Sequence, residues 1–138
     1  MKEKNFIRVT GDVYIDETDR YHIGDPTLNS TRATQVKTKT GAVITYFLRH
    51  QDEVIGLTDV AKALNVSTDS IRSAIYDKVE GDFNKSRFFR FEIDKSDRGN
   101  PKYCLRSVRP SEEDVQRVEE LDRTLCIDCE SGLDCLVA

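Results

Sequence analysis

The sequence lacks the long apolar runs that a membrane span or a secretory signal requires. None of its stretches approaches the ~18 consecutive apolar residues of a transmembrane helix, and the longest candidate is the mixed run Ala42–Leu48. The first residues, Met1–Asn5, lead into no apolar block, as a signal peptide would. We therefore expect a cytoplasmic protein without membrane contacts. Its 138 residues, 38% of them apolar, suffice for the core of a single domain.

The motifs of common enzyme classes are also missing. No G-x-G-x-x-G, G-x-x-x-x-G-K or H-E-x-x-H string occurs. The two histidines, His22 and His50, have no neighbouring nucleophile with a third, orienting group, so a catalytic triad is unsupported. Internal repeats and low-complexity tracts are absent as well. We expect that the protein is not an enzyme.

The net charge of −4 conceals two segments of opposite sign. Residues 111–138 contain nine acidic and two basic side chains and carry −7, so residues 1–110 carry +3. Within the latter, residues 85–109 hold eight basic and three acidic side chains, a local charge of +5. A basic segment followed by an acidic one indicates a surface for a polyanion more clearly than the total charge does.

The N-terminal third predicts strands. Residues 5–24 alternate apolar and polar side chains in short bursts divided by Gly and Asp, which indicates two or three strands in a meander. The polar segment 24–40 reads as a loop with one more short strand around Gln35–Lys37.

Three helices and a hairpin follow. Helical spacing begins after Thr40, which can cap a helix over about 41–50. After a short extended link, a second helix opens at Thr58 and is broken at residues 65–67. A third helix, capped by Ser67 or Thr68, runs to about Val79. Residues 88–93 and 102–106 alternate as strands around a turn-rich tip, residues 94–101, and predict a hairpin.

This order of elements is that of an α+β winged helix-turn-helix domain, with a recognition helix over 68–79 and a wing over 88–106. Such a domain places a short exposed helix in the major groove of DNA and a basic hairpin against the backbone or minor groove. On the third helix, one side carries Ile71, Ala74, Ile75 and Val79, and the other carries Asp69, Arg72, Ser73, Tyr76 and Asp77.

The outward side of that helix supplies the predicted base contacts. Arg72 is suited to guanine, Ser73 to a base edge or a phosphate, and Tyr76 to a phosphate or a thymine methyl group. Basic residues of the hairpin supply the phosphate contacts. The residues predicted to contact double-stranded DNA are Thr68, Arg72, Ser73, Tyr76, Arg90, Lys95, Arg98 and Lys102.

Four segments carry a resemblance to a known family. Residues 48–55, LRHQDEVI, are similar to the LxRHPGEVV-like segment that precedes the helix-turn-helix in OmpR/PhoB-type winged-helix domains. Residues 70–75, SIRSAI, resemble the start of the recognition helix in the ToxR/CadC subgroup. Residues 98–105, RGNPKYCL, resemble the RGxGYxL wing with one residue more, and residues 11–16 match the family's small N-terminal sheet. The resemblance spans about 8–106 and implies a DNA-binding transcription regulator.

The sequence also departs from that family. Residues 77–79, DKV, replace a Leu-Arg pair late in the recognition helix, which predicts fewer basic contacts there. Residues 39–42 replace the LTxxE start of the first helix. A receiver domain or transmembrane segment, usual in the family, is missing, so the resemblance implies a free-standing effector domain or a truncated chain.

The cysteines allow three interpretations. Cys126, Cys129 and Cys135 form C-x2-C-x5-C, to which Cys104 can add a fourth ligand for Zn or an iron–sulfur cluster. Disulfide formation or redox sensing is the second interpretation, and ordinary packed thiols are the third, because Cys104 falls in a predicted strand. Without a secretion signal, a reducing compartment is favoured. Our expectation is no cofactor, with the metal site as the alternative.

The C-terminal segment predicts an acidic helix over 111–125. Ser111 and Asp114 form a capping box, and Val115, Val118, Leu121 and Leu125 make a narrow apolar stripe. We therefore divide the chain into a winged helix-turn-helix domain, 1–110, and an acidic helix with a cysteine-containing tail, 111–138. This helix is suited to cover the domain, to form a homodimer, or to dock on RNA polymerase or another regulator.

The function expected from these features is sequence-specific DNA binding in transcription control. Two alternatives stay open. One is a protein-interaction module that sequesters another regulator through its acidic surface, and the other is a metal- or redox-responsive regulator that uses the C-terminal cysteines.

Overall fold

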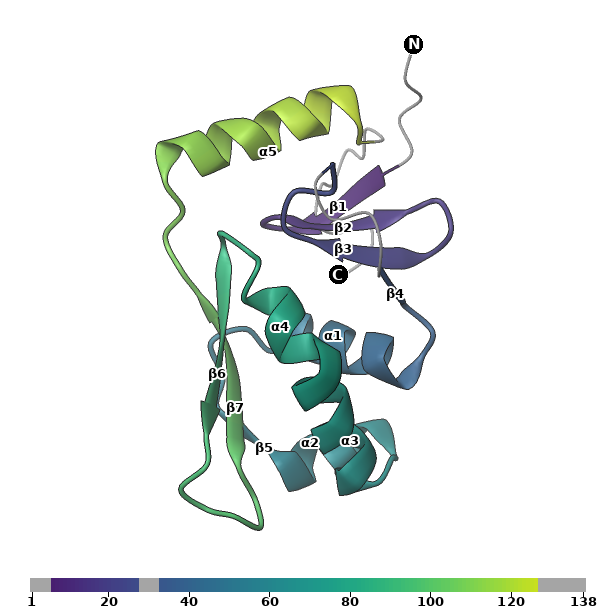
Figure 1. The fold of residues 1–138 in the computed structure, drawn as a ribbon, viewed down its shortest axis with the longest axis vertical. Helices are drawn as coiled ribbons and strands as arrows, with labels where there is room; N and C mark the ends of the chain where they lie inside the picture. Colours follow the sequence, from purple (N-terminus) through teal and green to yellow (C-terminus); the bar gives the residue numbers. More distant parts are fainter. Residues whose placement is uncertain (1–5, 28–32, 127–138) are drawn as a thin grey trace.

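The computed structural model describes residues 6–27 and 33–126, which form an α+β fold with two small antiparallel sheets (Figure 1). The first sheet has the order β1–β2–β3–β4, and the second has the order β5–β7–β6. In the chain, α1 follows the first sheet, β5 separates α1 from α2, and α2 to α4 precede the β6–β7 hairpin, while α5 lies across the first sheet. The strands are β1 (Phe6–Thr10), β2 (Val13–Asp16), β3 (Arg20–Ile23), β4 (Thr34–Gln35), β5 (Ile55–Gly56), β6 (Phe89–Asp94) and β7 (Lys102–Ser107).

The N-terminal meander is confirmed, and both faces of its sheet are covered. Val13 pairs with Ile23 across β2 and β3, and both side chains enter the main core. Tyr14, on the other face of β2, is fully buried against α5 (Glu112–Thr124). The predicted extra strand exists as β4, shifted by one residue toward the N-terminus. Because successive strand residues face opposite sides, one short strand serves two packing surfaces.

Helix α1 (Lys39–Arg49) begins earlier than predicted, and its cap is not Thr40. The hydroxyl of Thr38 accepts a hydrogen bond from the Gly41 amide at 3.1 Å and donates one to the Gln35 carbonyl at 2.7 Å. Thr38 has the extended backbone of an N-cap, whereas Thr40 already lies within the helix. The sequence prediction was wrong here because two threonines compete for one cap, and the turn at residues 35–38 decides between them.

Helix α2 (Leu57–Leu64) and helix α3 (Thr68–Ala74) are joined by the predicted break. Asn65 takes the left-handed conformation with φ 55°, which ends α2. Ser67, rather than Thr68, caps α3, since its side chain accepts from the Ser70 amide at 3.1 Å. Only residues 65–67 therefore separate the two helices.

The third helix is longer than predicted, because α3 continues through the π-helical segment η1 (Ile75–Val79) into α4 (Glu80–Phe83). Its buried side chains, Ile71, Ile75, Val79 and Phe83, recur at every fourth residue. In a regular α-helix that spacing drifts by about 40° per step. A π turn holds more residues, so η1 keeps all four on one face. The division of this helix into a buried and an outward side, predicted from the sequence, is confirmed.

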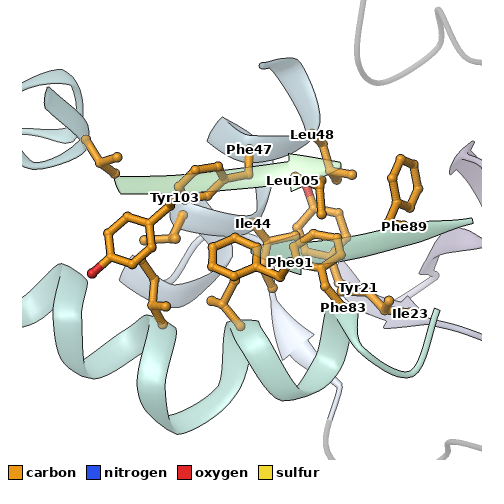
Figure 2. Packing of buried hydrophobic residues seen from close by; sticks show 14 of the residues in the cluster. Tyr21, Ile23, Ile44, Phe47, Leu48, Phe83, Phe89, Phe91, Tyr103 and Leu105 are labelled. Carbon is orange, nitrogen blue, oxygen red and sulfur yellow. The ribbon is translucent and has the colours of Figure 1, made fainter. Parts of the chain in front are cut away.

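An aromatic cluster centred on Phe91 joins the helices to the hairpin (Figure 2). The Phe91 ring of β6 contacts Phe47 of α1 edge-to-face at 5.1 Å between centroids and stacks on Phe83 of α4 at 6.1 Å. Tyr103 of β7 lies 5.9 Å from it on a third side. Each such ring pair adds about 0.5–1.5 kcal/mol beyond the apolar area it buries. Phe83 completes this cluster, which explains why the helix extends past Val79.

Helix α5 is fixed to the N-terminal sheet at several points. Its predicted apolar stripe is largely used within the chain, since Leu121 and Leu125 pack on Tyr14 while Val115 stays exposed. The Arg8 guanidinium donates to the Asp122 carboxylate at 2.9 Å, and the Arg117 guanidinium donates to Asp25 at 2.8 Å.

Hydrogen bonds stabilise both the N-terminus of α5 and its ion pair with Asp25. The Ser111 side chain accepts from the Asp114 amide, as predicted, but the Asp114 carboxylate accepts from the Ser111 hydroxyl rather than from its backbone amide. Burial acts to raise the pKa of Asp25, yet hydrogen bonds from Arg117 and Thr27 outweigh it and hold that pKa below its usual value. The Asp25 carboxylate therefore stays charged at neutral pH and keeps its pairing with Arg117.

Two glycine-to-alanine substitutions test the packing of α1. A Cβ at Gly41 would lie 2.1 Å from the Gln35 carbonyl oxygen, whereas a Cβ at Gly81 in α4 would meet no heavy atom within 4 Å. We expect Gly41→Ala to lower the free energy of unfolding by about 1–3 kcal/mol and Gly81→Ala to raise it by about 0.5–1 kcal/mol. Urea unfolding followed by circular dichroism measures both, and equal effects would contradict the packing described for α1.

Candidate nucleic-acid interface

The outward side of the third helix presents polar and aromatic side chains. Arg72, Ser73 and Tyr76 are exposed there, and Tyr76 keeps 78% of its surface accessible. Asp69 and Asp77 are exposed on the same side. The Tyr76 ring and the Arg72 guanidinium are therefore both accessible to a partner, one turn apart on the same side of the helix.

The hairpin has an inner and an outer face. Phe89, Phe91 and Ile93 point inward, while Arg90, Glu92 and Asp94 alternate with them on the outer face. On β7, Lys102 is directly opposite Asp94 and therefore belongs to the outer face. The tip, residues 95–101, carries the exposed Lys95 and Arg98.

The tip is a turn that is held by hydrogen bonds from backbone amides to side-chain carboxylates. The Asp97 carboxylate accepts from the Gly99 amide at 3.2 Å and from the Asn100 amide at 3.3 Å. The Asp94 carboxylate accepts from the Ser96 amide at 2.9 Å, and the hydrogen bonds from Ser96 hold the pKa of Asp94 below its usual value. The acidic residues of the tip are therefore engaged in shaping it.

Asn100 ties the tip to the helices. Its side-chain oxygen accepts from the Thr58 amide at 3.0 Å and so satisfies one free donor at the start of α2. The Pro101 carbonyl accepts from the Leu57 amide at 2.9 Å. From the sequence, Asn100 was predicted only as a turn residue. A long-range cap of this kind has no local signal, because its partner lies 42 residues away.

The structure brings four of the predicted DNA-contacting residues together. Arg72 donates to the Arg98 carbonyl at 3.5 Å, which joins the third helix to the hairpin tip. Arg72, Tyr76, Lys95 and Arg98 also line one cavity of about 390 Å³ between these two elements. This group is called the helix–tip cluster below.

The other four lie apart from the helix–tip cluster. Thr68 is half-buried at the start of α3, and Ser73 is exposed on the helix without lining the cavity. Arg90 lies at the base of the hairpin, opposite Arg106, and Lys102 lies on the outer face. The hairpin therefore separates its predicted phosphate contacts into tip residues and outer-face residues.

The acidic helix does not cover this surface. Helix α5 packs on β1 and β2 through Arg8 and Tyr14, at the end of the molecule opposite the hairpin tip (Figure 1). Its acidic side chains therefore leave the helix–tip cluster accessible.

The cysteines within the described residues do not form a metal site. Cys104 is buried on β7, and burial raises the pKa of its thiol, which disfavours the thiolate that binds metals. Cys126 is buried beside Tyr14 in a different cluster, and Cys129 and Cys135 lie outside the described residues. Over 6–27 and 33–126, no group of three His, Cys, Asp or Glu side chains is placed to hold a metal ion. Among these residues, too, no helix has the length and apolarity needed to cross a bilayer.

Removing the Asn100 side chain tests its role in fixing the tip. We expect Asn100→Ala to cost about 1 kcal/mol, as the loss of a helix cap does, and to speed hydrogen exchange at the Thr58 amide. The control is Gln116→Ala, because the side chain of Gln116 is exposed on α5 and forms no hydrogen bond with the side chains or loops among the described residues. Unchanged exchange at Thr58 in Asn100→Ala would show that the cap does not form in solution.

Replacing Cys104 separates packing from metal binding. Because its thiol is packed in the sheet, we expect Cys104→Ser to lower the free energy of unfolding by about 1–3 kcal/mol through burial of a hydroxyl. Zinc and iron contents, measured on protein purified without chelator, should be equal in the two proteins. A metal equivalent that is present in the parent and lost in Cys104→Ser would establish Cys104 as a ligand.

Comparisons of the chain with protein-family models, with curated proteins and with solved structures found no match. The function is therefore inferred from the side chains of this chain and their arrangement.

Proposed function

We propose that the protein is a sequence-specific, double-stranded DNA-binding regulator of transcription with a winged helix-turn-helix domain of OmpR/PhoB type, similar to the ToxR/CadC subgroup. In this proposal the helix over residues 68–83 is the recognition helix and the β6–β7 hairpin is the wing. The proposal depends on one observation: the outward side of that helix and the basic tip meet at the Arg72–Arg98 contact, uncovered by α5.

The helix supplies the proposed base contacts. Arg72 has five N–H donors and uses one of them on the Arg98 carbonyl, so the rest of its fork can reach the two acceptors of a guanine. Ser73, one residue further along the exposed side, suits a base edge or a phosphate. The accessible ring of Tyr76 suits a thymine methyl group, with its hydroxyl on a phosphate.

The hairpin supplies the proposed phosphate contacts. Lys95 and Arg98 make no ion pair with any described residue, so binding DNA would not require breaking an existing pair. Neutralised phosphates release counterions, which makes this part of the affinity dependent on salt and independent of sequence. Arg90 and Lys102 on the outer face, and Thr68 at the helix start, would contribute only if the backbone curves around the hairpin.

The packing of α5 within the chain limits which partners this helix can bind. Leu121 and Leu125 are buried within the chain, so a homodimer through the apolar stripe would require α5 to detach. The exposed acidic side, with Glu112, Glu113 and Glu119, remains as a surface for RNA polymerase or another regulator. A single small module seldom reaches operator-level affinity alone, which keeps a dimer on DNA within the proposal.

Two arginine substitutions test the division between base and phosphate contacts. We expect Arg72→Ala to reduce discrimination between specific and random duplexes by about 1–3 kcal/mol. Arg98→Ala should weaken both duplexes equally and reduce the slope of log K against log salt by about 1. Gel-shift titrations against genomic fragments, followed by fluorescence anisotropy at two salt concentrations, measure both effects.

Arg109→Ala is the matched control for these substitutions. Arg109 is also exposed but lies in the linker between β7 and α5, so its removal should change neither quantity. Equal loss of discrimination from Arg72→Ala and Arg98→Ala would contradict the assigned roles.

A second candidate function is favoured by the acidic side chains on the recognition surface. Asp69 and Asp77 are exposed beside Arg72 and Tyr76, which suits a protein partner with basic residues better than a phosphate backbone. The winged helix would then sequester another regulator. The same titrations decide, since the absence of any salt-dependent complex at micromolar protein favours the protein-interaction module.

A further inference from the structure

The cavity between the third helix and the hairpin tip has the dimensions of a ligand site. Its volume of about 390 Å³ lies within the range of about 300–1,000 Å³ that is typical of small-molecule pockets. Ile75, Ile93 and Pro101 give it apolar walls, and Tyr76 and Tyr103 add two aromatic rings. A flat apolar molecule could bury its surface against these walls and stack on the two rings.

The polar groups of the cavity are unevenly distributed. Arg72, Lys95 and Arg98 line it, and Arg72 reaches the tip through the Arg98 carbonyl. The two acidic lining residues, Asp97 and Glu80, do not oppose this cluster equally. Asp97 is the one carboxylate at the tip end and is hydrogen-bonded to the tip amides, and Glu80 lies eight residues along the helix from Arg72. The tip end of the cavity is therefore cationic.

Tyr103 adds a hydroxyl that is available to form a hydrogen bond. In Figure 2 its hydroxyl points away from the aromatic cluster, and within the described residues no hydrogen bond to it is formed. Tyr103 lines the cavity together with Arg72 and Glu80, so this hydroxyl belongs to the polar part of its lining. A bound molecule could therefore exchange a hydrogen bond with it.

We propose that this cavity binds a small anion with a flat apolar body, its acidic group held by Lys95, Arg98 and Arg72, and that the bound anion competes with DNA. The acidic group can be a carboxylate, a sulfonate or a phosphate, since all three accept from guanidinium and ammonium donors. The competition rests on the proposed function, because all of the helix–tip cluster lines the cavity. By linkage, DNA must weaken the anion by the same factor as the anion weakens DNA.

Two matched probes test the anion site. 8-Anilinonaphthalene-1-sulfonate has two aromatic groups and one sulfonate, and N-phenyl-1-naphthylamine has the same ring system without the charge. We expect saturable binding of the sulfonate at one site per chain, followed by its fluorescence, with higher affinity than the neutral probe. Equal affinities for the two probes, or no saturable binding, would overturn the proposal.

Paired variants locate the site. The double substitution Lys95→Ala with Arg98→Ala should weaken the sulfonate about fivefold and leave the neutral probe nearly unchanged. Lys85→Ala with Arg87→Ala is the control, because these two basic residues line a different cavity, of about 500 Å³, beside α5. A loss in the control instead would place the probe in that cavity and overturn the assignment. Circular dichroism verifies that both variants remain folded.

Adding DNA to the sulfonate complex separates this inference from the proposed function. We expect specific duplex to displace the probe and lower its fluorescence. A ternary complex, with probe and DNA bound together, would overturn the competition while leaving DNA binding intact. Binding of the probe without any DNA binding would overturn the proposed function and leave the anion site standing.

Discussion

The ring cluster around Phe91 determines how the rest of the molecule is arranged. It takes one aromatic side chain from α1, one from the end of the long helix and one from the neighbouring strand, so three elements are fixed by a single packing centre. The long helix must keep Ile71, Ile75, Val79 and Phe83 on this side, and the π segment makes that possible. Its rotation is then settled, and Arg72 and Tyr76 have to face outward. The packing of the core thus determines which side chains the candidate interface presents.

The base of the hairpin is held by packing on the Phe91 ring cluster, whereas its tip is held by hydrogen bonds. Near the base, Phe89 and Phe91 hold it against the helices. Toward the tip the contacts change from apolar to polar, with Asn100 on the start of α2 and Arg72 on the Arg98 carbonyl. The cavity lies at this transition, so its lining combines apolar side chains with Arg72, Lys95 and Arg98. The proposed recognition surface and the proposed ligand site therefore share residues of the helix–tip cluster.

Local signals in the sequence predicted much of this arrangement, and long-range contacts account for what they missed. Alternation located the strands, and the buried and outward sides of the third helix follow directly from residue spacing. The end of that helix was missed because residues 80–83 stay helical through the contact of Phe83 with Phe91. The residues next to Phe83 in the sequence carry no signal of that contact. The choice of Thr38 over Thr40 depends on a preceding turn. The meeting of Arg72 with Arg98 required the fold, since 26 residues separate them in the chain.

The position of α5 has a consequence for how the protein would approach a polyanion. Arg8 and Arg117 hold the acidic helix against the N-terminal part of the chain, and the hairpin tip with Lys95 and Arg98 lies at the opposite end of the molecule. At physiological salt, interactions between exposed charges are largely screened beyond about 8 Å. A polyanion that approached the tip would therefore meet the local charges of the helix–tip cluster rather than the carboxylates of α5. At low ionic strength the screening length grows, and the α5 carboxylates would then repel the polyanion as well.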